Sequence, residues 1–301
     1  MPIDYAHLKQ RHFPPVRQTL TADHCILYAL ALGAGDDALS DSALAFTYEG
    51  HAGGLRVLPT QAVVLGHPGL WIREPDVELD WKNVLHGEQR LRVHKPFPVG
   101  GVVVGTNRVA RLTDKGAGRG AVMVMERTLA DEQGAVLATL EQVNFCRGDG
   151  GYTAARGGQP SDEPLAPLAP TPEGRAPDAV FEQFIRPDAA LLYRLLADKN
   201  PLHVDPAVAQ SVGFERPILH GLASYGIACR AVLRHFAEDD PTRLIEFDTR
   251  FSAPVYPGET LRVEMWQGTD DEQPGRIRFR ASVVERGKVV LTHGQALLAV
   301  V

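Results

Sequence analysis

The chain has 301 residues, 44% of them hydrophobic and 23% charged, a composition typical of a folded globular protein that excludes disordered and fibrous classes. Its formal net charge of -6, with no run rich in Lys and Arg, argues against nucleic-acid binding, because phosphate neutralisation requires a basic surface. The three cysteines are far apart and no apolar run approaches the roughly 18 residues of a membrane span, so we expect a cytoplasmic protein without a membrane segment.

The first half of the chain repeats in the second half at three places. Residues 23–30 match 188–195, residues 96–100 match 254–258, and residues 133–137 match 286–290. The matches keep their order while the separation between matching segments shortens along the chain. We interpret this as a duplicated domain whose second copy has lost loop residues.

A stretch rich in Gly, Pro and Ala separates the two copies. It has too few periodic apolar positions to form a packed element, so it is typical of a linker. The sequence therefore predicts an N-terminal domain over residues 1–148, a linker over 149–178 and a C-terminal domain over 179–301.

The second copy begins with helix signals. A helix is predicted to start at Pro187 and to stop before Pro201, and a short helix to start at Asp205 and end at Gly213. A longer helix is expected over residues 221–236. Small residues cover much of its surface, which indicates close wrapping by other parts of the chain.

Only strand signals follow that helix. They cover residues 243–251, 261–266, 276–285 and 288–299, and turn residues join the last two. One central helix followed by antiparallel strands predicts an α+β unit with the helix laid on a curved sheet.

The strongest candidate site lies between the first two helices of this copy. On a continuous helix Asp198 and His203 would point about 140° apart. Pro201 prevents a continuous helix and favours an extended Asn200, so the chain can fold back and bring His203 towards Asp198. A carboxylate beside an imidazole can hold a water, remove its proton and return a proton to carbon near neutral pH.

A second part of this candidate site precedes the long helix. The segment leading to Gly221 opens a helix whose first backbone N–H groups have no partner within the helix. Such an N–H group, that of Gly221, can stabilise an enolate oxygen formed from a thioester.

Other chemistries find no support in the sequence. The histidines His203, His220 and His235 lack the ligand spacing of a metal site, so we expect no metal. Neither a Gly-x-Ser-x-Gly elbow nor a Gly-x-Gly-x-x-Gly turn is found, which argues against an acyl-serine mechanism and a nicotinamide cofactor. We expect an enzyme without a cofactor.

These motifs together resemble a known family. The run from Tyr193 to Asp205 contains Asp-x-Asn-Pro-x-His, and residues 213–214, 217–221 and 254–258 follow it. The pattern is similar to the MaoC-like (R)-specific 2-enoyl-CoA hydratases, or hydratase 2, in the two-copy form of the hydratase part of peroxisomal multifunctional enzyme type 2. The resemblance covers nearly the whole chain and implies an α+β double hotdog fold, each hotdog being a long helix wrapped by an antiparallel sheet.

The resemblance also implies roles for single residues. Asp198 and His203 become the acid/base pair that holds the water, Asn200 an active-site polar group, and Gly221 the backbone donor to the thioester oxygen. One departure is visible, because Ala197 stands where the family usually has Gly. If that position requires a positive φ, Ala197 is strained; if it requires only a small residue, alanine suffices.

The function that the resemblance implies is reversible hydration of trans-2-enoyl-CoA to (3R)-3-hydroxyacyl-CoA. Two alternatives stay open at this point: a dehydratase acting on acyl-carrier-protein or branched thioesters, and a non-catalytic acyl-CoA-binding protein. The expected partners are the acyl-CoA substrate and, by analogy with the family, a second copy in a homodimer.

The first copy has lost the catalytic groups. Aligned with the second copy, it has Gly33 opposite Asp198, Gly35 opposite Asn200 and Ala38 opposite His203. It can serve merely as a packing partner, or the lost side chains can leave an apolar pocket for a long acyl tail. In the second case, a large residue at Gly33 or Ala62 should penalise long substrates selectively.

Overall fold

The computed structural model describes residues 3–37, 39–196, 198–269 and 272–300. Two positions discussed above, Ala38 and Ala197, lie outside these residues. The correspondence of Ala38 with His203 and the strain at Ala197 therefore remain predictions.

The strands of the described residues form one antiparallel sheet of ten. Across the sheet they are β1 (Val16–Leu20), β3 (Gly101–Asp114), β4 (Ala121–Asp131), β5 (Val136–Cys146), β2 (Val84–Val93), β7 (Leu244–Phe251), β10 (Lys288–Leu298), β9 (Arg276–Val283), β8 (Thr260–Gln267) and β6 (Ala179–Phe184). Each strand has its counterpart at the mirror position, β1 with β6, β3 with β8, β4 with β9, β5 with β10 and β2 with β7. Two five-stranded units thus meet at the β2–β7 pair. The predicted α+β double hotdog fold is confirmed.

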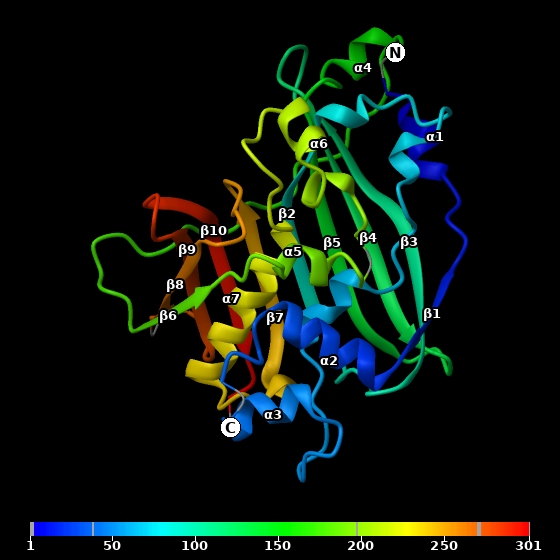
Figure 1. The fold of residues 1–301 in the computed structure, drawn as a ribbon. Helices are drawn as coiled ribbons and strands as arrows, with labels where there is room; N and C mark the ends of the chain where they lie inside the picture. Colours follow the sequence, from blue (N-terminus) through cyan, green and yellow to red (C-terminus); the bar gives the residue numbers. More distant parts are fainter. Residues whose placement is uncertain (1–2, 38, 197, 270–271, 301) are drawn as a thin grey trace.

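The helices lie in front of this sheet (Figure 1). The second copy has α5 (Ala189–Tyr193), η4 (Pro201–His203), α6 (Pro206–Ser211), α7 (Gly221–Phe236) and η5 (Pro241–Arg243). The first copy and the segment after it have α1 (Tyr5–Gln10), α2 (Ala22–Ala31), α3 (Asp41–Thr47), η1 (Pro59–Val64), η2 (Trp71–Arg73), η3 (Trp81–Asn83) and α4 (Tyr152–Ala155). The two copies differ here. The second copy has the 16-residue α7, whereas the longest helix described in the first copy is the ten-residue α2, so the long helix expected in each copy is found only in the second.

Helix α7 is buried over residues 223–229 and 231–233. An added Cβ at Gly226 would lie 2.6 Å from Leu32 Cδ1 and 3.0 Å from the Tyr28 hydroxyl, both in the first copy. The predicted close wrapping of this helix is therefore confirmed. One hydrophobic core continues across both copies, from Tyr28 through Leu91 to Phe247.

One prediction of local structure was wrong, and one strand was not predicted. The helix predicted from Pro187 is the short α5, after which the chain continues in single turns such as Leu196 N–H to Tyr193 O. Strand β6 was not predicted, because it is a short edge strand with only one buried residue, Gln183, that directly follows the Pro-rich stretch. In the part of the chain that the structure describes, no helix is long and apolar enough to cross a bilayer.

Candidate active site

The loop from Asp198 to His203 is folded back by its own side chains. Asp198 Oδ1 accepts a hydrogen bond from the Asn200 backbone N–H at 3.0 Å, and Asn200 Oδ1 accepts one from the Leu202 N–H at 3.2 Å. Asn200 thereby caps η4, in which Pro201 takes the first position. These two bonds turn the chain so that His203 approaches Asp198.

The resulting pair is spaced for a bridging molecule. His203 Nε2 lies 3.9 Å from Asp198 Oδ2, which is too long for a direct hydrogen bond but allows one water to contact both groups. His203 is buried, whereas 43% of the Asp198 side chain is exposed. A ligand can therefore reach the pair from the Asp198 side.

The hydrogen bond that Nδ1 of His203 makes shows which of the two ring nitrogens carries the proton. His203 Nδ1 lies 2.9 Å from the Ile218 carbonyl oxygen, which can only accept, so Nδ1 carries the hydrogen. The lone pair of the neutral ring is then on Nε2, on the side of Asp198. Burial lowers the pKa of His203 below its ordinary value, outweighing the opposite effects of the Ile218 carbonyl and the Asp198 charge. The ring is a neutral base at pH 7.

His220 contacts both members of the pair. Its Nε2–H donates to the Asp198 backbone carbonyl at 3.1 Å, and its ring stacks on the His203 ring with centroids 3.6 Å apart. Burial, followed by the neighbouring His203, lowers the pKa of His220 to about 4. In the sequence, His220 belongs to the segment 217–221 and to the histidines without metal-ligand spacing, but nothing in its spacing from Asp198 predicts this contact.

The helix α7 begins directly after His220, at Gly221. The Ala223 and Ser224 N–H groups donate to the His220 carbonyl oxygen, whereas the Gly221 N–H has no acceptor among the described residues and is free for a ligand. A Cβ on Gly221 would lie 3.2 Å from two carbons of the Phe251 ring. A side chain at this position would therefore require the Phe251 ring to move by a few tenths of an ångström.

The first copy contributes a group that the sequence did not single out. The His86 ring on β2 meets the Phe251 ring edge to face at 4.8 Å, so it lies one side chain away from Gly221. Its Nε2–H donates to the Glu88 carbonyl oxygen at 3.1 Å, and burial lowers its pKa to about 4. No motif marks His86; only the pairing of β2 with β7 brings it here.

Asp198, His203 and His220 offer ligand atoms within 4.8 Å of one another, the spacing of a metal site. The orientation of these atoms does not fit one. His220 uses Nε2–H for the Asp198 carbonyl, and the two rings are stacked only 25° from parallel, so their in-plane lone pairs do not converge. The arrangement is suited to proton transfer.

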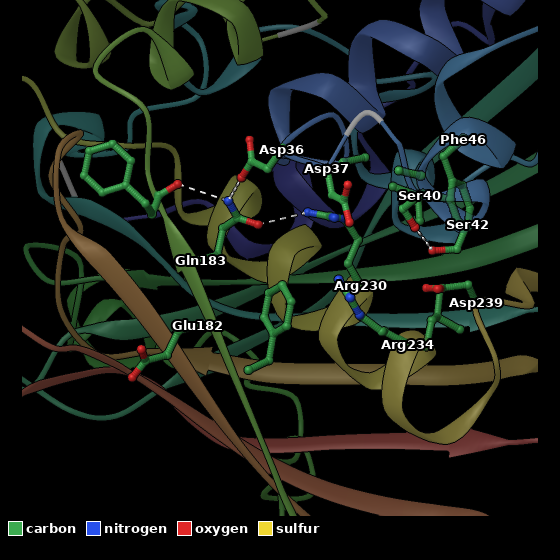
Figure 2. A pocket seen from close by; sticks show the side chains of 17 residues that line it. Asp36, Asp37, Ser40, Ser42, Phe46, Glu182, Gln183, Arg230, Arg234 and Asp239 are labelled. Atoms are coloured by element: carbon green, nitrogen blue, oxygen red, sulfur yellow. Dashed lines mark hydrogen bonds between the residues drawn. The ribbon is translucent and has the colours of Figure 1, made fainter.

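Gly33, one of the two positions suggested for the acyl-tail pocket, lines a cavity of about 210 Å³ near the C-terminal end of α7 (Figure 2). Six of the 17 residues that line it are charged, among them Arg230, Arg234 and Asp239. Gly33 has φ +77°, and an added Cβ would lie 2.7 Å from Gln183 Nε2. A substitution at Gly33 would strain the fold, so Ala62, fully buried on η1 against α7, is the better position for testing a tail pocket.

Comparison with known proteins gives two family matches. A model described as the MFE-2 hydratase 2 N-terminal domain matches residues 19–148, and one described as the MaoC like domain matches residues 169–292. The chain is similar to "Probable enoyl-CoA hydratase 2" of Dictyostelium discoideum, at 37% identity over 99% of this chain and 97% of that one. It is 40% identical to "Peroxisomal multifunctional enzyme type 2" of Drosophila melanogaster over 89% of this chain, and it spans only 44% of that longer protein.

Solved structures agree with these matches. The crystal structure of a MaoC-like dehydratase from Phytophthora capsici superposes with a TM-score of 0.83 at 31% identity and covers 99% of both chains. A Mycobacterium tuberculosis protein described as having a double hotdog fold matches with a TM-score of 0.58 at 19% identity, which supports the fold alone.

Proposed function

The chain belongs to the MaoC-like hydratase 2 family, the (R)-specific enoyl-CoA hydratases, and from this premise we propose that Asp198 and His203 perform the hydration. The substrate is a trans-2-enoyl-CoA and the product a (3R)-3-hydroxyacyl-CoA. The observation that carries the proposal is the 3.9 Å separation of Asp198 Oδ2 and His203 Nε2, with the lone pair of the imidazole on the shared side.

Each group of the pair has one task in the addition of water. Asp198 accepts one hydrogen of the water and orients it, and His203 Nε2 removes the other proton as the water oxygen bonds to C3. The electrons of the double bond move towards the thioester oxygen, which becomes an enolate. The pair then returns one proton to C2, so that His203 is neutral again and no external acid is consumed.

The enolate oxygen needs a donor that is already in place. We propose that the Gly221 N–H at the start of α7 supplies it, because this group has no partner within the helix and the helix dipole favours negative charge there. Asn200 contributes mainly by holding the loop, since its side-chain oxygen is engaged with the Leu202 N–H.

Asp198→Asn and His203→Asn test the pair. Asparagine at 198 keeps an oxygen for the Asn200 N–H, and asparagine at 203 keeps a donor near the position of Nδ1 for Ile218 while removing Nε2. We expect each variant to lose about 10²- to 10⁴-fold in kcat with an unchanged fold. The measurement is the spectroscopic loss of the conjugated thioester with crotonyl-CoA. Turnover at the wild-type rate by either folded variant would contradict the proposed site.

Two finer points belong to the proposal. The homodimer rests on the family resemblance, and an acyl tail reaching into the first copy rests on the loss of the catalytic side chains there. For the second, Ala62→Phe places a large side chain in the proposed tail pocket and should lower kcat/KM for a decenoyl thioester far more than for crotonyl-CoA. Because Ala62 is fully buried beside α7, an equal loss on both substrates would indicate damage to the fold.

A further inference from the structure

We propose that His220 is a positioning residue of the hydration, which holds the backbone of Asp198 and the ring of His203 in the arrangement that binds the water. This inference rests on the proposed function of the pair. His220 takes no part in proton transfer itself.

The first contact fixes the start of the loop. Asp198 lies between α5, which ends at Tyr193, and η4, which begins at Pro201, so no regular element holds it. The His220 Nε2–H donates to its carbonyl from 22 residues away. Because His220 is the N-cap of the 16-residue α7, this bond attaches the loop to the rigid start of a long buried helix.

The second contact fixes the ring that acts as the base. His203 is held in its plane by the Ile218 carbonyl and against its face by the His220 ring, 3.6 Å away. Ile218, His220 and Gly221 belong to one short segment. That segment sets the tautomer of the base, the position of the carboxylate and the donor for the enolate oxygen together.

The surroundings of His220 keep it neutral. Its Nδ1 is buried and, among the residues that the structure describes, has no hydrogen-bond partner; the Tyr193 hydroxyl, whose ring lies 4.8 Å from that of His220, is in the same situation. Protonation at Nδ1 would bury a donor that has no acceptor and would place a positive charge against the His203 ring. The charge of Arg194 also disfavours the protonated ring, and only Asp198 favours it. Because Nε2–H is already engaged by the Asp198 carbonyl and Nδ1 is buried, His220 holds its neighbours without exchanging a proton with the bound water.

Two variants separate the contacts of His220. His220→Gln keeps an amide N–H near the position of Nε2 and loses the ring, whereas His220→Phe keeps a ring for the stack and loses the donor. We expect His220→Phe to lower kcat for crotonyl-CoA by about 10- to 100-fold with KM within about threefold, because displacement of a catalytic group by about 1 Å costs rate rather than substrate binding. The logarithm of kcat for His220→Gln should lie at least halfway from the value of His220→Phe to that of the wild type.

The matched control is His235→Phe, near the other end of α7 and outside the site. It should keep both kcat and KM, and thermal unfolding of all three variants checks that they are folded. A folded His220→Phe with kcat within twofold of wild type overturns the proposal, and so does a His220→Gln no better than His220→Phe. The proposed function is tested separately by Asp198→Asn: if that variant is inactive while His220→Phe is fully active, only the positioning role is wrong.

Discussion

The pairing of Asp198 with His203 depends on two short-range hydrogen bonds and one proline. Asp198 and Asn200 each accept a backbone N–H two residues further along, and Pro201 starts η4. All three features are local, so a segment of six residues specifies its own turn. The position of this turn relative to the helix start at Gly221 depends on His220.

The role of the Gly221 N–H can be tested by removing that one donor. Proline is favourable at the first position of a helix, and His220, with φ -58° and ψ 131°, already has the extended backbone that precedes proline. Gly221→Ala is the control, because it brings the same Cβ towards Phe251 but keeps the N–H. We expect kcat of Gly221→Pro to be about 10²- to 10³-fold below that of Gly221→Ala. Equal rates for the two variants would exclude the oxyanion role.

The pH dependence of the rate follows from the buried histidine. Only the neutral form of His203 can accept a proton from water, and burial places its pKa below the ordinary value of 6.5. We therefore expect kcat/KM to stay level as the pH falls past 6.5 and to decrease only as the pH passes the lowered pKa. Initial rates with crotonyl-CoA between about pH 4 and 8 measure this, and an acid limb centred above 6.5 would contradict it.

The free energy of unfolding should also decrease at acid pH. Between pH 6.5 and about 4 the unfolded chain binds protons at His220 and His86 that the folded chain does not, so the free energy of unfolding falls as the pH falls through this window.

At the scale of elements, α7 decides how the two copies meet. Its buried residues include Ala223, Gly226, Ala228 and Ala231, and the first copy comes so close at Gly226 that a Cβ there would force Leu32 to shift. The longest helix described in the first copy is the ten-residue α2. Only one copy therefore has a long helix whose start faces a catalytic pair.

Gly226→Ala should destabilise the protein although alanine is the better helix former by about 1 kcal/mol. The added Cβ would lie 2.6 Å from Leu32 Cδ1, and Leu32 is fully buried, so relief requires a shift in the core that costs about 1–3 kcal/mol. Urea unfolding measures the change. Leu32→Ala in the same chain removes the clash, and the double variant should be more stable than the sum of the single changes predicts. Strictly additive effects would show that the contact is unimportant.

At the scale of the molecule, the two copies are joined by the β2–β7 pair at the centre of the sheet. Asp248 on β7 is fully buried there and accepts hydrogen bonds from the Leu91 N–H, from Arg92 and from the Gln295 amide. Asp248 thus satisfies donors from both copies at once.

Asp248→Ala should lower the free energy of unfolding by about 2–4 kcal/mol, because it leaves the Leu91 N–H and the Gln295 amide buried without an acceptor. The comparison is Glu182→Ala on the edge strand β6, whose partner Arg262 is 47% exposed; this loss should be at most about 1 kcal/mol. Denaturant unfolding measures both. Equal losses would mean that the centre of the sheet is no more sensitive than its edge.

The sequence alone was sufficient for the features that depend on neighbouring residues. Hydrophobic periodicity predicted the range of α7 and the four strands β7 to β10, and the repeated segments predicted two copies. The Asp-x-Asn-Pro-x-His motif predicted a turn that brings His203 towards Asp198, because proline and side-chain capping act over a few residues.

Only the tertiary structure decided which distant groups join that turn. The stacking of His220 on His203, the contact of Phe251 with Gly221 and the approach of His86 from the first copy all depend on where α7 and the β2–β7 pair lie. Edge strand β6 was also beyond prediction, because its pairing with β8 rather than its own pattern makes it a strand. Periodicity records which face of an element is buried, but it does not record which other element covers that face.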